Sequence, residues 1–146
     1  FAGRIKRHSA ESAGGAALKL TLHSTVNGEQ TDPLTTDCIC RSRNNELLIT
    51  YGQPLYDRIV KTIILLRKDH AVIRRQAPYQ THLTIREGRT EPGVYATGVG
   101  SADVQVTGKN IRHVTDKSGT TIHLHYELHG LAEQVLQIFL QIHITD

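Results

Sequence analysis

The sequence contains no methionine, no tryptophan and only two cysteines, and the cysteine shortage narrows the class of protein. Cys38 and Cys40 are two residues apart, so on a strand they share a face at about 6–7 Å, too far for an unstrained disulfide. No Cys-x-x-Cys zinc pattern is present. We expect buried structural thiols rather than a reactive pair, and a reducing compartment, the cytoplasm.

Long apolar runs are also missing. No stretch approaches the ~20 residues that a membrane helix needs, and no apolar segment follows the basic N-terminus as in a signal peptide. The apolar fraction of 38% is ordinary for a soluble globular protein, and 146 residues is the length of one domain. We therefore expect no membrane partner.

The net charge of +3 comes from the first ten residues, which hold Arg4, Lys6 and Arg7 and no acid. The 17 Lys and Arg less these three leave 14, equal to the 14 Asp and Glu. A nucleic-acid-binding domain needs a basic stripe, so we expect no nucleic-acid partner. Residues 1–16 are predicted to be a disordered or vector-derived tail, in a chain whose start at Phe1 indicates processing, fusion or a missing natural start. Residues 17–146 are predicted to form a single domain.

Alternation of apolar and polar residues is strongest in the stretch 120–145. Ile122, Leu124, Tyr126 and Leu128 alternate with polar side chains, and a second alternating segment follows Gly130. Side chains on a strand point to opposite faces in turn, so this stretch predicts a long hairpin. A three-residue turn around Gly130 would place His123 opposite Gln137.

The rest of the chain predicts more strands joined by short turns, and no window has a helical period. The expected strands are 18–22, 35–43, 46–51, 59–67, 71–75, 80–86, 94–99 and 102–107, the last continuing past a bulge at Gly108 to Val114. We predict an all-β protein, an antiparallel and mostly up-and-down β-barrel of about 8–10 strands, with a two-sheet sandwich as the alternative.

Several short pieces of the sequence, in order, resemble one known family. They are Tyr51, Lys61-Thr62-Ile63, Arg75, Gly88, Tyr95-Ala96-Thr97, Gly100, Val104, Val106, Ile111 and the strand 122–126. Over residues 18–144 the chain resembles the YwiB-like DUF1934 family, small bacterial proteins of unknown function.

The resemblance implies a calycin-like, lipocalin-like barrel and brings no catalytic residue and no cofactor. The chain departs from the family at two positions. Gly52 stands where the family tends to have an acid, and Ala77 stands where it tends to have glycine, which puts the local turn in doubt.

Histidines gather on the polar face of the 120–129 segment. His123 and His125 are spaced like two zinc ligands, and Glu127 and His129 follow on the same face. A third ligand is needed, and His143 is predicted to lie about 13 Å away, opposite a position near Lys117. The alternative to a metal site is a solvated outer face.

A second group combines cations with phenols on central strands: Lys61, Arg67, Arg74, Arg75, Tyr51 and Tyr95. An inward cation in a barrel can hold a carboxylate or phosphate, and a tyrosine adds a directed hydroxyl. We predict a ligand-binding set of Arg75, Tyr95, Tyr51, Lys61 and Tyr126. The alternative is that these residues face solvent or pair with acids at the rim.

No catalytic residue is predicted, because the sequence has no Gly-x-Ser-x-Gly, no phosphate loop and no His-Glu-x-x-His. The first hypothesis is a barrel that binds a small, anionic or amphipathic molecule. A filled barrel that binds a protein partner is the alternative, for which Phe139 on a polar face is the one hint. The third is a metal-dependent or histidine-based enzyme.

Overall fold

The structure is a computed structural model that describes residues 16–97, 100–131 and 133–146. The strands are β1 (Ala16–Val26), β2 (Glu29–Gln30), β3 (Leu34–Arg43), β4 (Glu46–Leu55), β5 (Arg58–Leu66), β6 (Ala71–Arg75), β7 (Thr81–Ile85), β8 (Thr90–Thr97), β9 (Gly100–Asp116), β10 (Gly119–Leu131) and β11 (Gln134–Thr145). Within these ranges no helix is long and apolar enough to cross a membrane. The predicted tail lies outside the described residues, except for Ala16.

The strands form one antiparallel sheet that closes on itself. Each strand from β3 to β11 pairs with its neighbour in sequence, and β1 pairs with both β3 and β11. The short β2 only extends the hairpin that begins at Asn27-Gly28. The prediction of an up-and-down barrel of about ten strands is confirmed, and closure leaves few unpaired strand edges.

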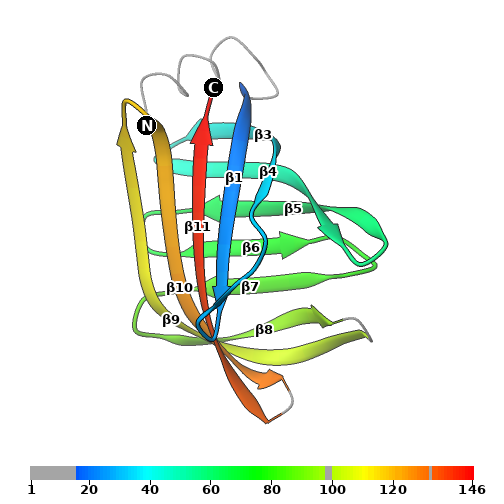
Figure 1. The fold of residues 1–146 in the computed structure, drawn as a ribbon. Coiled ribbons are helices and arrows are strands. Elements are labelled where there is room, and N and C mark those ends of the chain that lie inside the picture. The colour runs from blue at the N-terminus through cyan, green and yellow to red at the C-terminus, as the bar shows by residue number, and fades with distance from the viewer. Residues whose placement is uncertain (1–15, 98–99, 132) are drawn as a thin grey trace.

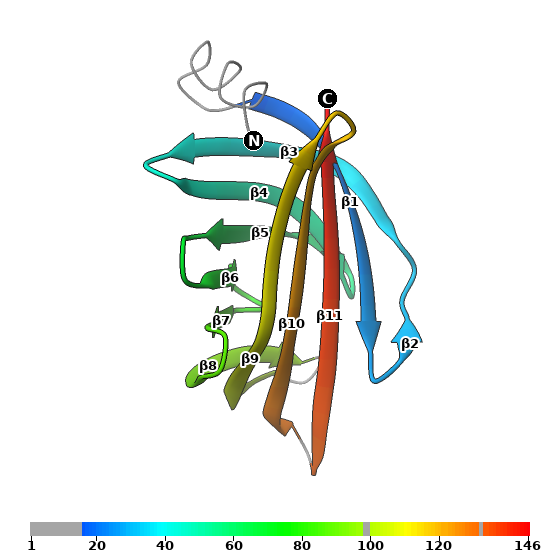
Figure 2. The same cartoon turned by 90° about the vertical axis from the view of Figure 1, so that its left-hand side faces the viewer.

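The barrel is flattened into two walls whose strands cross. The long strands β1, β9, β10 and β11 run upright in Figure 1, and β3 to β8 run across behind them. Figure 2 shows the same two walls from the side, with the long strands bowed around the shorter ones. Strands that cross in this way are typical of orthogonal packing, in which the two inner faces share one core.

Apolar rows fill the inside of the short-stranded wall. One row joins Leu47, Leu66, Ala71 and Ile85 by cross-strand pairing, and the next joins Ile49, Ile64, Ile73 and Leu83. All eight are buried, and Leu124, Leu128 and Ile142 of the opposite wall join the same core. Each such Leu or Ile contributes about 1.5–3 kcal/mol of transfer free energy, so these rows dominate the stability of the barrel.

Several strands are longer than predicted, among them β1, β4 and β9, and β8 begins earlier than predicted. We expected the third strand to end at Tyr51, but β4 continues through Gly52, Gln53 and Pro54, which pair with β5. We also expected 91–93 to precede a strand, but Pro92 lies inside β8. Because β8 has a single ladder pair with β7, at His82–Val94, the missing N–H of proline costs no hydrogen bond there.

The register of the last hairpin also differs from the prediction. Gly130 has a φ of 108° and forms a bulge within β10, so pairing continues to Leu131 and Gln134. His123 therefore lies opposite Gln141, not Gln137. The shift is four residues, an even number, so each side chain keeps its predicted face. The predicted bulge at Gly108 is confirmed.

Candidate functional site

The third inward row of the short-stranded wall is polar. Tyr51 pairs with Thr62, Thr62 with Arg75, and Arg75 with Thr81. Arg75 is the last residue of β6 and Thr81 the first of β7, so the row lies near one mouth of the barrel. Thr62 and Thr81 are fully buried and Arg75 is half-buried. The polarity of the inner face thus changes abruptly from the apolar rows to this one.

Arg75 has only a neutral partner. Its Nε and Nη2 atoms donate to the Gln53 side-chain oxygen at 3.3 and 3.0 Å, and the Thr62 hydroxyl donates to the same oxygen at 3.4 Å. Within the described residues no carboxylate forms an ion pair with Arg75. A guanidinium carries five N–H donors, and this arrangement uses two of them. The half-buried guanidinium of Arg75 therefore lies at this mouth with N–H donors that make no hydrogen bond to the described side chains.

Two buried phenols flank this cation. Tyr51 is 5% exposed and Tyr126, from the opposite wall, is 3% exposed. Within the described part of the chain neither hydroxyl makes a hydrogen bond, although buried hydroxyls almost always have a partner. Tyr95 of β8 is half-buried and packs against the core beside them. These groups form a donor-rich site, which we call the Arg75 site: Arg75, Tyr51, Tyr126 and Tyr95.

The phenols remain protonated donors at physiological pH. Burial raises the pKa of Tyr51 to about 12, against the opposing charge of Arg75. Burial also raises the pKa of Tyr126; Tyr95 adds to this and Arg75 opposes it. Both hydroxyls can therefore donate to an anion, as Arg75 can, without a proton having to leave the site.

The raised pKa of Tyr51 predicts a loss of stability in alkali. Its pKa is higher in the folded than in the unfolded chain, so its contribution is complete below pH 10 and disappears as pH rises through about 12. Two pH units correspond to about 2–3 kcal/mol. Urea unfolding at pH 9 and 11.5 should show wild type losing more stability than Tyr51→Phe, which has no proton to lose. An equal loss in both proteins would contradict the assignment.

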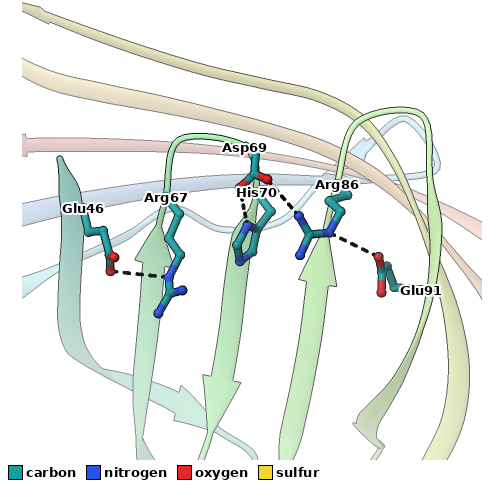
Figure 3. Close-up of polar contacts among 6 residues, drawn as sticks. All are labelled: Glu46, Arg67, Asp69, His70, Arg86 and Glu91. Atoms are coloured by element: carbon teal, nitrogen blue, oxygen red, sulfur yellow. Dashed lines mark hydrogen bonds and ion pairs between the residues drawn. The ribbon is translucent and has the colours of Figure 1, made fainter. Parts of the chain in front are cut away.

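At the other end of the barrel the arginines form ion pairs with carboxylates (Figure 3). Arg67 pairs with Glu46 at 3.4 Å. Arg86 bonds Asp69 at 3.1 Å and Glu91 at 3.2 Å, and Asp69 also bonds His70 at 2.7 Å. The predicted alternative, a cation paired with a rim acid, is therefore correct for Arg67. These charges compensate one another, whereas that of Arg75 has no such partner among the described residues.

Lys61 does not join the Arg75 site. It is exposed on the outer face opposite Gly52, because it follows Val60 and precedes Thr62, which both point inward. It lines an outer groove of about 780 Å³ with the exposed side chains of Ile39 and Ile59. Arg74 also lies on the outer face and is exposed. Of the five predicted ligand-binding residues, the structure brings four together.

Gln53 and Thr62 complete the site and were not predicted. The sequence predicts a strand that ends at Tyr51, before the Gly-Gln-Pro segment that is typical of a loop, yet Gln53 shares the inner face of β4 with Tyr51. The two-residue spacing of Tyr51 and Gln53 was the available signal. Thr62 is one of the residues that carry the family resemblance, and it lies on the inner face of β5 between the inward residues Val60 and Ile64.

The two cysteines are buried and reduced, as predicted. Their sulfur atoms are 3.9 Å apart, closer than the spacing of the strand positions implies, because the side chains lean together in a hydrogen bond. The bond to Cys38 and burial raise the pKa of the Cys40 thiol. The Cys40 thiol is thus held in its protonated, unreactive form.

The predicted metal ligands face outward without a third partner. Among the described residues no group of three side chains of the metal-binding types is placed to hold an ion. His125 instead stacks on Phe139, and its Nε2 atom lies 3.1 Å from the Gln137 oxygen. His143 lies opposite Thr121, two positions from His123 across the strand pair, so the predicted separation of about 13 Å was wrong. Its two ring nitrogens contact the Thr121 hydroxyl and the Ser118 carbonyl.

Comparison with known proteins supports the fold. The crystal structure of the YwiB protein from Bacillus subtilis superposes with a TM-score of 0.70 at 16% identity, covering 87% of this chain and 90% of that one. No curated protein sequence matches the chain. The family model of DUF1934, a domain of unknown function, matches residues 19–142. The chain therefore belongs to the DUF1934 family.

Proposed function

We propose that the barrel binds a small amphipathic anion, with a carboxylate or phosphate head group, at the Arg75 site. The observation that carries this proposal is a half-buried guanidinium whose one side-chain partner among the described residues is the neutral Gln53. A buried cation needs a compensating charge, and a planar guanidinium suits the two oxygens of a carboxylate or phosphate.

The neighbouring groups suit the same kind of ligand. The hydroxyls of Tyr51 and Tyr126 are protonated donors without a partner in the described chain, so they can complete the hydrogen bonds to an oxyanion. The apolar row of Ile64, Ile73 and Leu83 lies directly behind the polar row and favours a ligand with an apolar body. A ligand with one anionic head group and a short hydrocarbon chain would match both the polar row and the apolar row.

We place the access route at the β6–β7 loop. A pocket of about 520 Å³ lies on the outer side of this loop, lined by Arg75, Thr81 and the loop residues Gln76, Ala77 and Gln80 together with the outward row of Ile63, Arg74 and His82. The proposal therefore places the head group at Arg75 and the route of exchange with solvent past this loop.

Native mass spectrometry of freshly purified protein, followed by calorimetric titration, tests the proposal. We expect either a co-purified acid that is released on denaturation or saturable binding of octanoate, with octanol bound at least tenfold more weakly because it lacks the charge. A bare mass together with no binding of octanoate, benzoate or phenyl phosphate at millimolar concentration would overturn it.

A protein-interaction module is the second candidate. The outer groove that Lys61 lines carries Ile39 and Ile59, which are 48% and 67% exposed. Exposed apolar surface of this kind is what protein partners cover. Native mass spectrometry also tests this candidate. A dimer in the wild-type spectrum that is lost in Ile59→Asp would favour a second copy of the chain as the partner.

A further inference from the structure

A second groove, separate from the Arg75 site, lies on the outer face of the long-stranded wall. Its volume is about 690 Å³. Two cross-strand rows form its floor, the first made of His23, Gln141, His123 and Arg112, and the second of Thr25, Phe139, His125 and Asn110. Gln30 of β2 extends the second row beyond Thr25. We call it the Phe139 groove.

An aromatic ring in this groove is fixed and half open. Phe139 is 45% exposed although it lies between two strands. One face stacks on His125, with ring centroids 3.8 Å apart and an angle of 17° between the planes. The neighbour on the other side is Thr25, which is too small to cover a ring. A planar ligand can therefore stack on Phe139 without any rearrangement.

The groove is also electropositive. No carboxylate lines it, and Arg112 is exposed and forms no ion pair within the described residues. Glu127, on the same face of β10, is engaged by Gln137, by His129 at 3.2 Å and by Lys109 at 3.6 Å. The row of Arg112 supplies two further imidazoles, from His123 and His23, as hydrogen-bonding groups.

The geometry points to a binding site for a planar aromatic compound that carries a phosphate, of the nucleoside monophosphate class. The ring would stack on the free face of Phe139, over Thr25, and the phosphate would bind Arg112, with the side chains of Gln141 and His123 between them. Three strands and one row separate Thr25 from Arg112, about 16 Å between Cα atoms, so the extended arginine side chain and the ribose of the ligand would together cover this span.

Titration with adenosine monophosphate, adenosine and inorganic phosphate, followed by NMR shifts of the histidine and Phe139 rings, tests this assignment. We expect adenosine monophosphate to bind at least tenfold more tightly than either fragment, since only it reaches both ends of the groove. Phe139→Ala and Arg112→Ala should each weaken binding about five- to thirtyfold, because stacking and a charge-assisted contact are each worth about 1–2 kcal/mol.

Matched variants separate this site from the rest of the protein. Val135→Ala removes a side chain of β11 that is also 45% exposed, and Arg43→Ala removes an exposed arginine far from the groove, so both should bind like wild type. Binding that Arg75→Met abolishes would move the nucleotide to the barrel interior and overturn the assignment. Absence of saturable shifts at millimolar nucleotide, or equal affinity in Phe139→Ala and Val135→Ala, would overturn it as well.

Discussion

Replacing Arg75 by methionine is expected to weaken octanoate binding thirtyfold or more while leaving the unliganded protein at least as stable. The two effects have the same cause. Arg75 makes its hydrogen bonds to one neutral oxygen of Gln53, so the unliganded protein gains little from the charge and carries the cost of its partial burial. A bound carboxylate would compensate the charge of Arg75 and form charge-assisted hydrogen bonds with it.

The magnitudes follow from the contacts. Removing one partner of a desolvated, hydrogen-bonded charge pair costs about 2–5 kcal/mol, which is about thirtyfold to several-thousandfold in Kd. Methionine replaces the aliphatic part of the arginine side chain, is flexible and carries no charge, so it packs beside Tyr51 and Tyr126 without a donor. Calorimetry with octanoate gives the affinity, and urea unfolding without ligand gives the stability.

Arg86→Met is the control at the other end of the barrel. Arg86 is bonded to both Asp69 and Glu91, so its loss should destabilise the protein modestly and leave octanoate binding unchanged. If Arg75→Met destabilised the unliganded protein by 2 kcal/mol or more and bound octanoate normally, Arg75 would be a structural residue. That pattern would remove it from the proposed function.

The barrel could be predicted from the sequence because most of its strands alternate between apolar and polar residues. A buried inner face and a wet outer face impose a two-residue period, and short turns leave sequential pairing as the simplest topology. The period also survives errors of register. The predicted pairing of the last hairpin differs from the observed one by four residues, yet His123 and His125 lie on the outer face as predicted, because only a shift by an odd number of residues exchanges the faces.

The composition of the Arg75 site was harder to predict, because it depends on where strands end. Gln53 follows Gly52 and precedes Pro54, a combination typical of loops, and only pairing with Val60 keeps it in the sheet. The prediction that Lys61 belongs to the ligand-binding set was wrong for a different reason, the direction of its side chain. Its position next to Val60 and Thr62 defines an outward side chain, but that alternation is obscured by the continuous apolar run from Ile63 to Leu66.

Gly108→Ala is expected to destabilise the protein by at least about 3 kcal/mol, the largest effect we predict for a single methyl group. Gly108 lies at the bulge of β9, where this strand crosses the corner between β7 and β8. An added Cβ would lie 2.5 Å from the Arg86 carbonyl carbon and 2.8 Å from the Arg86 nitrogen. Both are backbone atoms, so no side-chain rotation relieves the overlap.

Backbone pairing at this corner is sparse, although Arg86 bonds Glu91 and the Glu87 carboxylate accepts from the Ile111 N–H. β7 and β8 share one ladder pair, and the hydrogen bonds from Gly88 N–H to the Gly108 carbonyl (2.9 Å) and from Gly108 N–H to the Arg89 carbonyl (3.0 Å) tie β9 across the gap. A methyl group that pushes β9 outward would break both bonds and open the barrel wall where its ladder is thinnest. We expect the midpoint of thermal unfolding to fall by about 10 °C or more.

Gly28→Ala is the control, because it shows the effect of replacing a glycine where no backbone atom lies close to the added Cβ. Gly28 has a φ of 85° in a hairpin turn, and nothing lies within 4 Å of an added Cβ, so its replacement should cost only about 1 kcal/mol of backbone strain. If Gly108→Ala is recovered only as aggregate while Gly28→Ala is soluble and folded, the conclusion is the same. Equal stabilities of the two variants would mean that β9 can move away from Arg86, and that closure of the barrel does not depend on contact at this corner.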